Sequence, residues 1–388
     1  MAPRHQSLDL DLARERFEDS TDFTVAIEEE FAIVDPATLE LVHGFEQLYE
    51  LCLADDLLAE AAKGELIDTE IEIRSGRGET YAQAVAQQQE HRRRLFALAE
   101  RQGVGLVAAG THPWADYLDQ QIINTAHYQR LQSDLGYVAQ RNNTWSLHAH
   151  VGVRGADRAI VVCDRLREVL PLLLAVSANS PFLDGHDTGL HSVRSQIFTR
   201  SFPRCGIHEP FGDWRSYADF VSLLQRTTSV IESTQLWWSV RPHHNFGTVE
   251  VRICDAQSRG EESLRLGALL LACVAQAARD HDDGLLAAAR PGREIEENLW
   301  RAIRHGMDGR MIDFDAGVEI EAAEALDRLL AWTAPMRAEL SLDAEPTPGP
   351  NGAQRARSAL AESGSIEQVY RMTLEETRRT YAPEPVAG

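Results

Sequence analysis

Apolar and polar residues alternate along several short segments of the chain, which is the period of a β-strand with one buried face. These segments are 23–34, 66–74, 104–109, 145–153, 193–199, 235–241 and 247–253. Longer segments with the helical spacing of apolar residues lie between them, at 80–102, 157–179, 216–234 and 261–280. After about residue 284 the pattern is helical alone, at 294–305, 318–340, 353–363 and 366–380. This order of elements predicts an α+β fold.

The same pattern predicts how the chain is organised. We expect a polar, mobile N-terminus over residues 1–20, followed by one domain over 21–388. Within this domain, a sheet with its helices occupies 21–283, and a helical C-terminal region occupies 284–388. Pro171 should kink the helical segment at 157–179, because proline lacks a backbone N–H and clashes with the preceding turn.

Four of the predicted strands carry ionisable side chains on one face and apolar side chains on the other. Successive strand residues point to opposite faces, so that residues i and i+2 share a face. A single polar face usually meets water, but surface strands favour Thr, Lys, Ser and Gln over Glu, His and Arg. The polar faces carry, in chain order, Glu28 and Glu30; Asp68, Glu70, Glu72 and Arg74; Ser146, His148 and His150; and Thr248, Glu250 and Arg252.

If these strands belong to one sheet, at least five carboxylates converge on one face. Carboxylates that lie so close raise each other's pKa and destabilise the folded state. Bound divalent cations relieve this repulsion, and a site rich in oxygen ligands suits Mg²⁺ or Mn²⁺ better than Zn²⁺. Arginine on the same faces adds the chemistry of phosphoryl transfer, in which metal ions and guanidinium groups stabilise phosphate oxygens. The sequence therefore predicts a metal and phosphate site on the sheet.

Composition narrows the choice of partners. The formal net charge is −22, from 60 acidic and 38 basic residues, which disfavours nucleic acid and anionic membranes as partners. Five dispersed cysteines without a CxxC pair argue against a disulfide framework or a zinc site: Cys52, Cys163, Cys205, Cys254 and Cys273. The longest apolar run, 266–278, is too short to span a bilayer, and no signal peptide is evident at the N-terminus. We expect a soluble, cytoplasmic protein, and its oligomeric state stays open.

Several short motifs occur in an order that resembles a known family. No GxxxxGK[ST] loop, dinucleotide-binding fingerprint or GxSxG elbow is present. The motifs that are present include Ile27-Glu28-Glu29-Glu30-Phe31, Gly110-Thr111-His112-Pro113-Trp114, Tyr128-Gln129-Arg130-Leu131, His148-Ala149-His150-Val151-Gly152, Ser180-Pro181-Phe182, Arg194-Ser195-Gln196-Ile197-Phe198, Trp238-Ser239-Val240-Arg241-Pro242 and Phe246-Gly247-Thr248-Val249-Glu250-Val251-Arg252. Together they resemble the type 2 glutamate–cysteine ligases, or YbdK-type carboxylate–amine ligases, of the glutamine synthetase-like superfamily.

The resemblance implies a curved antiparallel sheet shaped as a funnel, and a ligase that uses ATP and Mg²⁺ or Mn²⁺. Such an enzyme activates a carboxylate, typically the γ-carboxylate of glutamate, as an acyl phosphate, which an amine such as cysteine then attacks. By motif match, the metal ligands would be Glu28, Glu30, Glu72, His150 and Glu250. The choices of Glu72 over Glu70 and of His150 over His148 stay open, because each pair shares a face.

The remaining assignments concern the side chains that would bind nucleotide and substrate. Phosphate or substrate carboxylate would be bound by Arg194, Arg241 and Arg252, with Thr248 at the nucleotide, and the catalytic roles would fall to Arg194, Glu250 and Arg252. We assign substrate contacts to Thr111, His112, Tyr128 and Arg74. Two other functions are compatible with the sequence: a guanidino kinase-like phosphotransferase of the same superfamily, and a catalytically silent sensor of nucleotide or metal.

Overall fold

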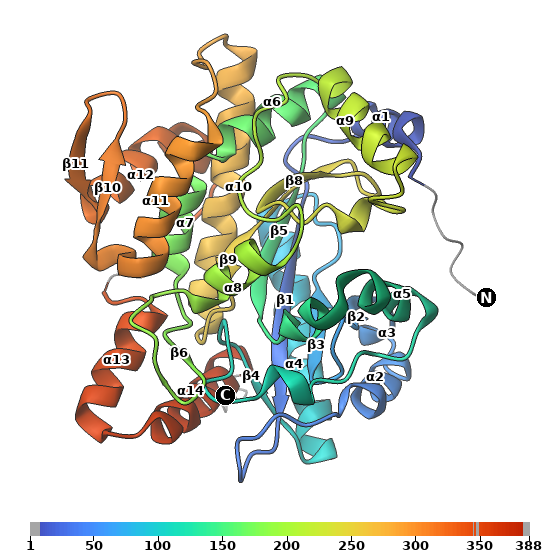
Figure 1. The fold of residues 1–388 in the computed structure, drawn as a ribbon, viewed down its shortest axis with the longest axis vertical. Helices are drawn as coiled ribbons and strands as arrows, with labels where there is room; N and C mark the ends of the chain where they lie inside the picture. Colours follow the sequence, from blue (N-terminus) through green and yellow to red (C-terminus); the bar gives the residue numbers. More distant parts are fainter. Residues whose placement is uncertain (1–7, 344, 347–348, 383–388) are drawn as a thin grey trace.

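A computed structural model describes residues 8–343, 345–346 and 349–382 of the chain (Figure 1). An antiparallel sheet forms its centre, with neighbouring strands in the order β2, β3, β1, β5, β9 and β8, and with β4 paired to β1. The sheet is open rather than closed into a barrel. Its strands are β1 (Val25–Val34), β2 (Ala62–Lys63), β3 (Glu70–Arg74), β4 (Gly105–Val107), β5 (Ser146–Gly152), β8 (Val240–His243) and β9 (Thr248–Asp255).

The four strands with polar faces are neighbours in this sheet, in the order β3, β1, β5, β9. Directly opposed residues of paired strands point to the same face. Glu30 lies opposite Glu72, Glu28 opposite His148, and His150 opposite Glu250. The register therefore brings the predicted carboxylates and histidines together on one face of one sheet.

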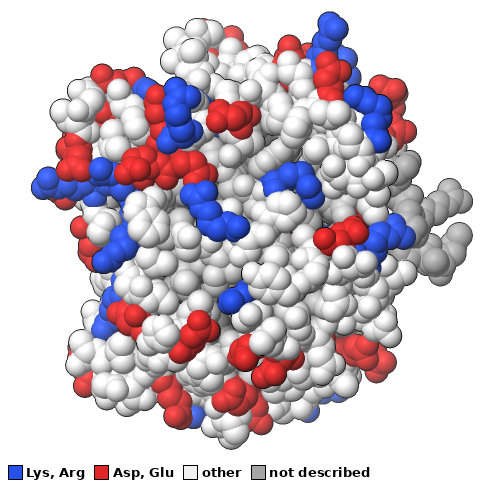
Figure 2. All heavy atoms as spheres, in the orientation of Figure 1, with Lys and Arg blue, Asp and Glu red and all other residues white. Residues whose placement is uncertain are grey.

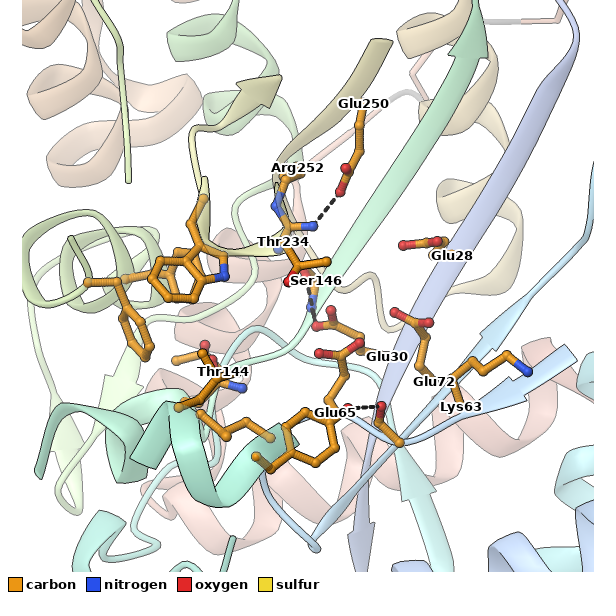
Figure 3. Close-up of a pocket in the computed structure, with 18 of the residues that line it drawn as sticks. Glu28, Glu30, Lys63, Glu65, Glu72, Thr144, Ser146, Thr234, Glu250 and Arg252 are labelled. Atoms are coloured by element: carbon orange, nitrogen blue, oxygen red, sulfur yellow. Dashed lines mark hydrogen bonds and ion pairs between the residues drawn. The ribbon is translucent and has the colours of Figure 1, made fainter. Parts of the chain in front are cut away.

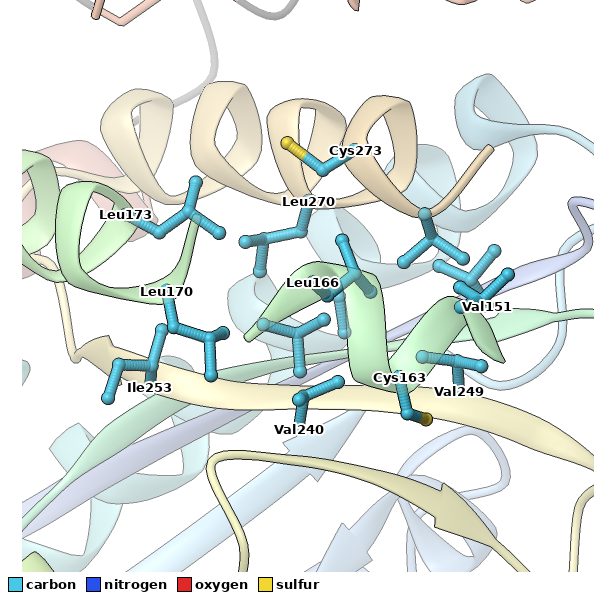
Figure 4. Close-up of a cluster of buried hydrophobic side chains, with 14 of the residues drawn as sticks. Val151, Cys163, Leu166, Leu170, Leu173, Val240, Val249, Ile253, Leu270 and Cys273 are labelled. Carbon is cyan, nitrogen blue, oxygen red and sulfur yellow. The ribbon is translucent and has the colours of Figure 1, made fainter. Parts of the chain in front are cut away.

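The other face of the sheet is covered by helices α6 (Ala156–Leu166), α7 (Leu170–Ser177) and α10 (Gly260–Asp282) (Figures 1 and 4). Strand residues such as Val151, Val249 and Ile253 pack there against helix residues. All are buried, so the apolar faces of the strands and helices form one core. This core fixes the sheet, and the sheet in turn fixes the polar face. Figure 4 labels the helix residues Cys163, Leu166, Leu170, Leu173, Leu270 and Cys273 in this layer.

A second apolar cluster packs around Phe31 at the other end of β1. It is built from strands β3 and β4 together with helices α2 (Phe45–Leu53), α4 (Tyr81–Gln102) and α14 (Ile366–Tyr381). The remaining α-helices are α1 (Leu10–Glu18), α3 (Leu58–Ala61), α5 (Ala126–Leu135), α8 (Val193–Ser201), α9 (Trp214–Arg226), α11 (Gly292–His305), α12 (Ala322–Glu339) and α13 (Gly352–Ser363), with 3₁₀ turns at Tyr117–Asp119, Gly136–Asn142, Ser233–Gln235 and Gly306–Asp308.

Two predicted strands differ in the structure. Segment 193–199 forms helix α8, because the Ser192 side chain accepts the backbone N–H of Ser195 and caps a helix there. Segment 235–241 starts at the last residue of the 3₁₀ turn Ser233–Gln235, and only residues 240–241 of the segment belong to β8. Alternation over so few residues does not separate a strand from a short helix when a capping side chain decides the local structure.

The two ends of the chain also differ from the prediction. Part of the N-terminus expected to be mobile forms α1, whose Phe17 is fully buried, while residues 1–7 lie outside the described residues. The C-terminal region is not helical throughout, because Arg310–Asp313 and Val318–Glu321 pair as the hairpin β10–β11. A second small hairpin joins β6 (Phe182–Leu183) to β7 (His186–Asp187).

Pro171 has a stronger effect than the predicted kink. The segment divides into α6 and α7, and Pro171 sits in the first turn of α7, where its missing N–H costs little. Within the described part of the chain, no helix combines the length and apolarity needed to cross a bilayer.

Candidate active site

The polar face of the sheet lines a cavity of ≈ 330 Å³. Its walls carry five carboxylates and five basic side chains, and the carboxylates of β1, β3 and β9 point toward one another across it (Figure 3). The residues predicted as metal ligands all line this cavity: Glu28, Glu30, Glu72, His150 and Glu250. The fifth carboxylate is Glu65, and the basic side chains are Lys63, Arg74, Arg194, Arg241 and Arg252.

Two groups of side chains in this face have the spacing of metal ligands. In the first, atoms of Glu28, His150 and Glu250 lie within 4.8 Å of one another, and in the second the same holds for Glu28, Glu72 and His148. His150 Nδ1 lies 3.1 Å from Thr248 Oγ1, and His150 Nε2 lies 3.1 Å from Glu28 Oε1 and 3.9 Å from Glu250 Oε1. An imidazole held at one nitrogen by a hydroxyl, with the other nitrogen facing two carboxylates, suits a metal ligand. The residues present therefore fit a divalent cation.

The structure shows where the alternative metal ligands lie relative to the cavity. Glu72 lines the cavity, whereas Glu70 is buried beside it, with no hydrogen bond to either carboxylate oxygen. His150 lines the cavity, whereas His148 does not and bonds to its neighbours on the same face, with Nε2 2.7 Å from Ser146 Oγ and Nδ1 3.3 Å from Glu28 Oε2. The assignments of Glu72 and His150 as ligands stay predictions, and the positions of both side chains support them.

Arginine side chains hold several of the carboxylates in place. Arg241 Nε donates to Glu250 Oε2 at 2.6 Å, and Arg252 also donates to Glu250. Arg74 Nε donates to Glu72 Oε1 at 2.5 Å and lies 3.0 Å from Glu28 Oε1. These bonds use charged donors and acceptors in a buried site, where such bonds are stronger than between neutral groups.

The carboxylates differ in pKa because their neighbours differ. Burial opposes ionisation of Glu250, but Arg241 and Arg252 outweigh it and hold the pKa of Glu250 well below its usual range. Burial and the nearby charge of Glu72 raise the pKa of Glu30 to about 7. Burial and the charge of Glu30 likewise raise the pKa of Glu65 to about 7. Excess negative charge therefore gathers around Glu30 and Glu65, and a bound cation would lower it.

The other end of the cavity is largely apolar. Trp237 and two phenylalanines, Phe198 and Phe202, line it beside Leu131 and Leu135 of the segment that includes α5. Tyr128, predicted as a substrate contact, also lines the cavity, and its hydroxyl donates to the Gly64 carbonyl at 2.6 Å. The cavity thus joins a charged end, suited to phosphates and metal ions, to an apolar end.

Two predicted substrate contacts lie elsewhere. Thr111 is buried and donates to the Phe182 carbonyl at 2.9 Å, outside the cavity. His112 is fully buried, with Nε2 2.8 Å from the Leu39 carbonyl and Nδ1 accepting from the backbone N–H groups of Trp114 and Ala115. Backbone groups occupy both His112 nitrogens and neither residue lines the cavity, so the structure does not bring them to the other predicted site residues, and their substrate roles stay predictions.

Other predicted residues sit at or near the cavity in different ways. Arg74, Arg194, Arg241 and Arg252 line it, whereas Thr248 does not and instead contacts His150. The prediction missed Lys63, the last residue of the two-residue strand β2, and Glu65, in the segment between β2 and β3. It also missed Trp237 and Phe202, because side chains outside regular elements carry no periodic signal, and His243, at the end of the short strand β8.

Solved structures share this fold. The chain superposes on a bifunctional glutathione synthetase from Pasteurella multocida with a TM-score of 0.66 and 12% identity, covering 96% of this chain and 54% of that one. It also superposes on a glutamate–cysteine ligase from Francisella tularensis in complex with AMP, with a TM-score of 0.62 and 11% identity, covering 95% and 91%. The protein therefore shares the fold of these two ligases.

Sequence comparison gives the family. Residues 24–369 match the model of Glutamate-cysteine ligase family 2, and the chain belongs to this family. "Putative glutamate--cysteine ligase 2-2" of Rubrobacter xylanophilus is 37% identical over 359 residues, which cover 92% of this chain and 91% of that protein. "Putative glutamate--cysteine ligase 2" of Solibacter usitatus is 34% identical over 361 residues, covering 91% and 93%.

Proposed function

We propose that this protein is an ATP-dependent carboxylate–amine ligase of the glutamate–cysteine ligase type. The observation that carries the proposal is the cavity itself, in which metal-spaced carboxylates and several arginines share one face of the sheet. Membership of Glutamate-cysteine ligase family 2 supports the same reaction class. The AMP bound in the Francisella tularensis ligase supports an adenine nucleotide as the phosphate donor.

The proposed reaction has two steps. The γ-phosphoryl group of ATP passes to a substrate carboxylate, for which glutamate is our candidate, and this gives an acyl phosphate and ADP. An amine, for which cysteine is the candidate, then attacks the acyl carbon, loses a proton, and expels inorganic phosphate to leave an amide. When bound at Glu28, Glu30, Glu72, His150 and Glu250, Mg²⁺ or Mn²⁺ would neutralise phosphate oxygens.

The protein's own side chains would orient the reactants. Arg194, Arg241 and Arg252 surround the charged end and offer planar donors that suit phosphate or carboxylate oxygens. Because Glu250 already fixes Arg241 and Arg252, little reorganisation is needed when negative charge develops near them. Trp237 and Phe202 would exclude water from the apolar end and pack against the uncharged parts of a ligand.

Product analysis tests the proposal. The protein is incubated with ATP, Mg²⁺, glutamate and each of a panel of amines, and the products are identified by mass spectrometry. We expect ADP, inorganic phosphate and an amide in equal amounts with at least one amine. A phosphorylated guanidine with no free phosphate would support the phosphotransferase instead, and binding of nucleotide without any turnover would support the sensor.

A further inference from the structure

Two of the sequence motifs, 110–114 and 180–182, do not line the cavity, yet they meet at one buried carboxylate. Asp255, the last residue of β9, is fully buried. Its Oδ2 accepts from Ser180 Oγ at 2.7 Å and from the Asn179 backbone N–H at 2.9 Å, and its Oδ1 accepts from Ser192 Oγ at 2.9 Å. These serines flank the segment that leads into α8, which lies beside β9 (Figure 1).

The close packing around Asp255 explains a glycine in another motif. A Cβ atom on Gly110 would lie 2.8 Å from both Asp255 Cγ and Ser180 Cβ, closer than such atoms approach in proteins. The Gly110 carbonyl also accepts from the Trp145 N–H at 3.1 Å, just before β5. Gly110 is thus required by Asp255 and its partners rather than by a ligand.

Arg194 is the side chain that connects this buried cluster to the cavity. It stands in the first turn of α8, and its backbone N–H donates to Ser180 Oγ at 3.2 Å. Its Nη1 donates to the Ile253 carbonyl at 3.1 Å and lies 3.5 Å from Asp255 Oδ1, and its Nη2 donates to the Arg252 carbonyl at 3.2 Å. Nε is buried without a hydrogen bond, although the side chain lines the cavity.

We propose that Asp255 is a positioning residue for Arg194, holding the guanidinium so that it binds an anionic group of a substrate in the cavity. Asp255 supplies a buried counter-charge to Arg194, just as Glu250 supplies one to Arg241 and Arg252. Without that charge, Arg194 is drawn toward the carboxylates of the cavity, among them Glu30. The inference rests on the proposed function only in taking the bound anion to be a substrate of the ligase.

The test combines variants of the two residues in the full-length protein. Arg194→Gln, Asp255→Asn and the double variant are compared by kcat and by KM for ATP and for glutamate. We expect Arg194→Gln to lower kcat/KM by about 10²-fold and Asp255→Asn by about 10-fold or more, as for groups that orient metal ligands. Both single variants should raise the KM of the same substrate. The kcat/KM of the double variant should match that of Arg194→Gln within about twofold.

A matched control separates positioning from stability. Asp164 is also a buried carboxylate that accepts backbone N–H groups, those of Phe211 and Gly212, but it does not line the cavity. Asp164→Asn should lower the melting temperature and leave both KM values unchanged in the folded protein. Losses that multiply in the double variant, or an Asp255→Asn protein whose KM values match those of the wild type, would overturn the inference.

A milder change keeps the test decisive if Asp255→Asn does not fold. Ser180→Ala removes a donor to Asp255 and an acceptor for the Arg194 N–H, and it should raise the same KM by about threefold or more. Ser177→Ala, at a buried serine whose hydroxyl donates to the Leu174 carbonyl, should not. An unchanged KM in Ser180→Ala would count against the inference.

Binding measurements separate this inference from the proposed reaction. Calorimetry with Mg²⁺–ADP and with glutamate needs no turnover, so it applies even if no amide is made. Arg194→Gln and Asp255→Asn should weaken the binding of the same one of these two probes. If the wild type binds the probes but makes no amide, the proposed reaction fails while the inference is still decided. If Arg194→Gln weakens neither probe, the inference fails whatever the reaction.

Discussion

Arg241 and Glu250 face each other across the paired strands β8 and β9, and Arg241 Nε donates to Glu250 Oε2 at 2.6 Å. Arg252 reaches the same carboxylate from two residues further along β9. Glu250 is fully buried, so its negative charge depends on these two arginines. One carboxylate thereby orients two arginines and remains ionised at the edge of the proposed metal site.

The first prediction separates Glu250 from Arg252. Glu250→Gln keeps the shape of the side chain but removes its charge, so we expect activity to fall by about 10²–10³-fold and the Mg²⁺ concentration for half-maximal activity to rise. Loss of the counter-charge should also lower the free energy of unfolding by about 3 kcal/mol.

Arg252→Lys should lower kcat with the Mg²⁺ requirement nearly unchanged, because lysine keeps the charge but lacks the planar fork. Metal titrations of the two variants and denaturant unfolding check these expectations, and equal Mg²⁺ requirements would contradict them.

The second prediction concerns the need for metal. Five carboxylates line one cavity, and Arg74, Arg241 and Arg252 are already paired with carboxylates there, so ATP should need a cation to bridge its phosphates to the acidic side chains. Calorimetry in the presence of EDTA should show little ATP binding, and added Mg²⁺ or Mn²⁺ should restore it. Tight binding of ATP in EDTA would show that the carboxylates do not act as a metal site.

The third prediction is a pH dependence of stability at His112. Burial lowers the pKa of His112 to about 4, against about 6.5 in an unfolded chain. Between these values the unfolded state binds a proton that the folded state does not, so this contribution to stability is lost as the pH falls. The loss is about 1.4 kcal/mol per pH unit, or about 3 kcal/mol across the window.

His112→Asn removes the titrating group while keeping an acceptor near the N–H groups of Trp114 and Ala115. Urea unfolding at several pH values between 7 and 4.5 should show a shallower slope for this variant than for the wild type. At neutral pH the folded variant should keep its KM values, because His112 lies outside the cavity. Equal slopes would mean that His112 titrates normally, and raised KM values would support its assignment as a substrate contact.

The sequence was informative where side chains repeat along a strand. The shared face of Glu28 and Glu30, of Glu70 and Glu72, and of His148 and His150 could be predicted because a strand places every second residue on one face, and a core on the opposite face fixes which face that is. The choice of Glu72 and His150 within these pairs came from the family resemblance. The alternation and the apolar opposite face can both be recognised without knowing where the turns between strands lie. The order of strands is not encoded in this period, so the contact of β1 with both β3 and β5 required the structure or the family resemblance.

Residues outside regular strands were harder to predict. Thr111 and His112 lie in a motif that resembles a binding loop, but their side chains form hydrogen bonds with the carbonyl groups of Phe182 and Leu39, which are far away in the chain. Glu65 enters the cavity from a loop, and its neighbours give no alternation that would mark it. The prediction of a strand at 193–199 was wrong because a single capping hydroxyl at Ser192 outweighed the alternation and favoured a helix.

The fourth prediction concerns the cysteines, all of which lie in the described part of the chain and are free. Cys205 alone is half-buried, and burial raises the pKa of its thiol to about 12, which makes it a poor nucleophile. Replacing each cysteine with Ser or Ala should therefore leave kcat within a few-fold. A loss of several orders of magnitude in one folded variant would indicate covalent catalysis and would require a different mechanism.

The last prediction tests the facing of β9 itself. Val251 lies between Glu250 and Arg252 in sequence but points to the opposite face, where it is fully buried in the core with Val249 and Ile253. Val251→Ala removes buried methyl groups, so it should lower the free energy of unfolding by about 1 kcal/mol or more while the folded protein keeps its kcat and KM values. Denaturant unfolding and steady-state kinetics on one preparation measure both quantities. Glu250→Gln is the matched comparison, because it changes the neighbouring residue on the other face and should affect the chemistry most. If Val251→Ala abolished activity in a folded protein while Glu250→Gln left it intact, the strand would face the other way, and the convergence of carboxylates on one cavity would be wrong.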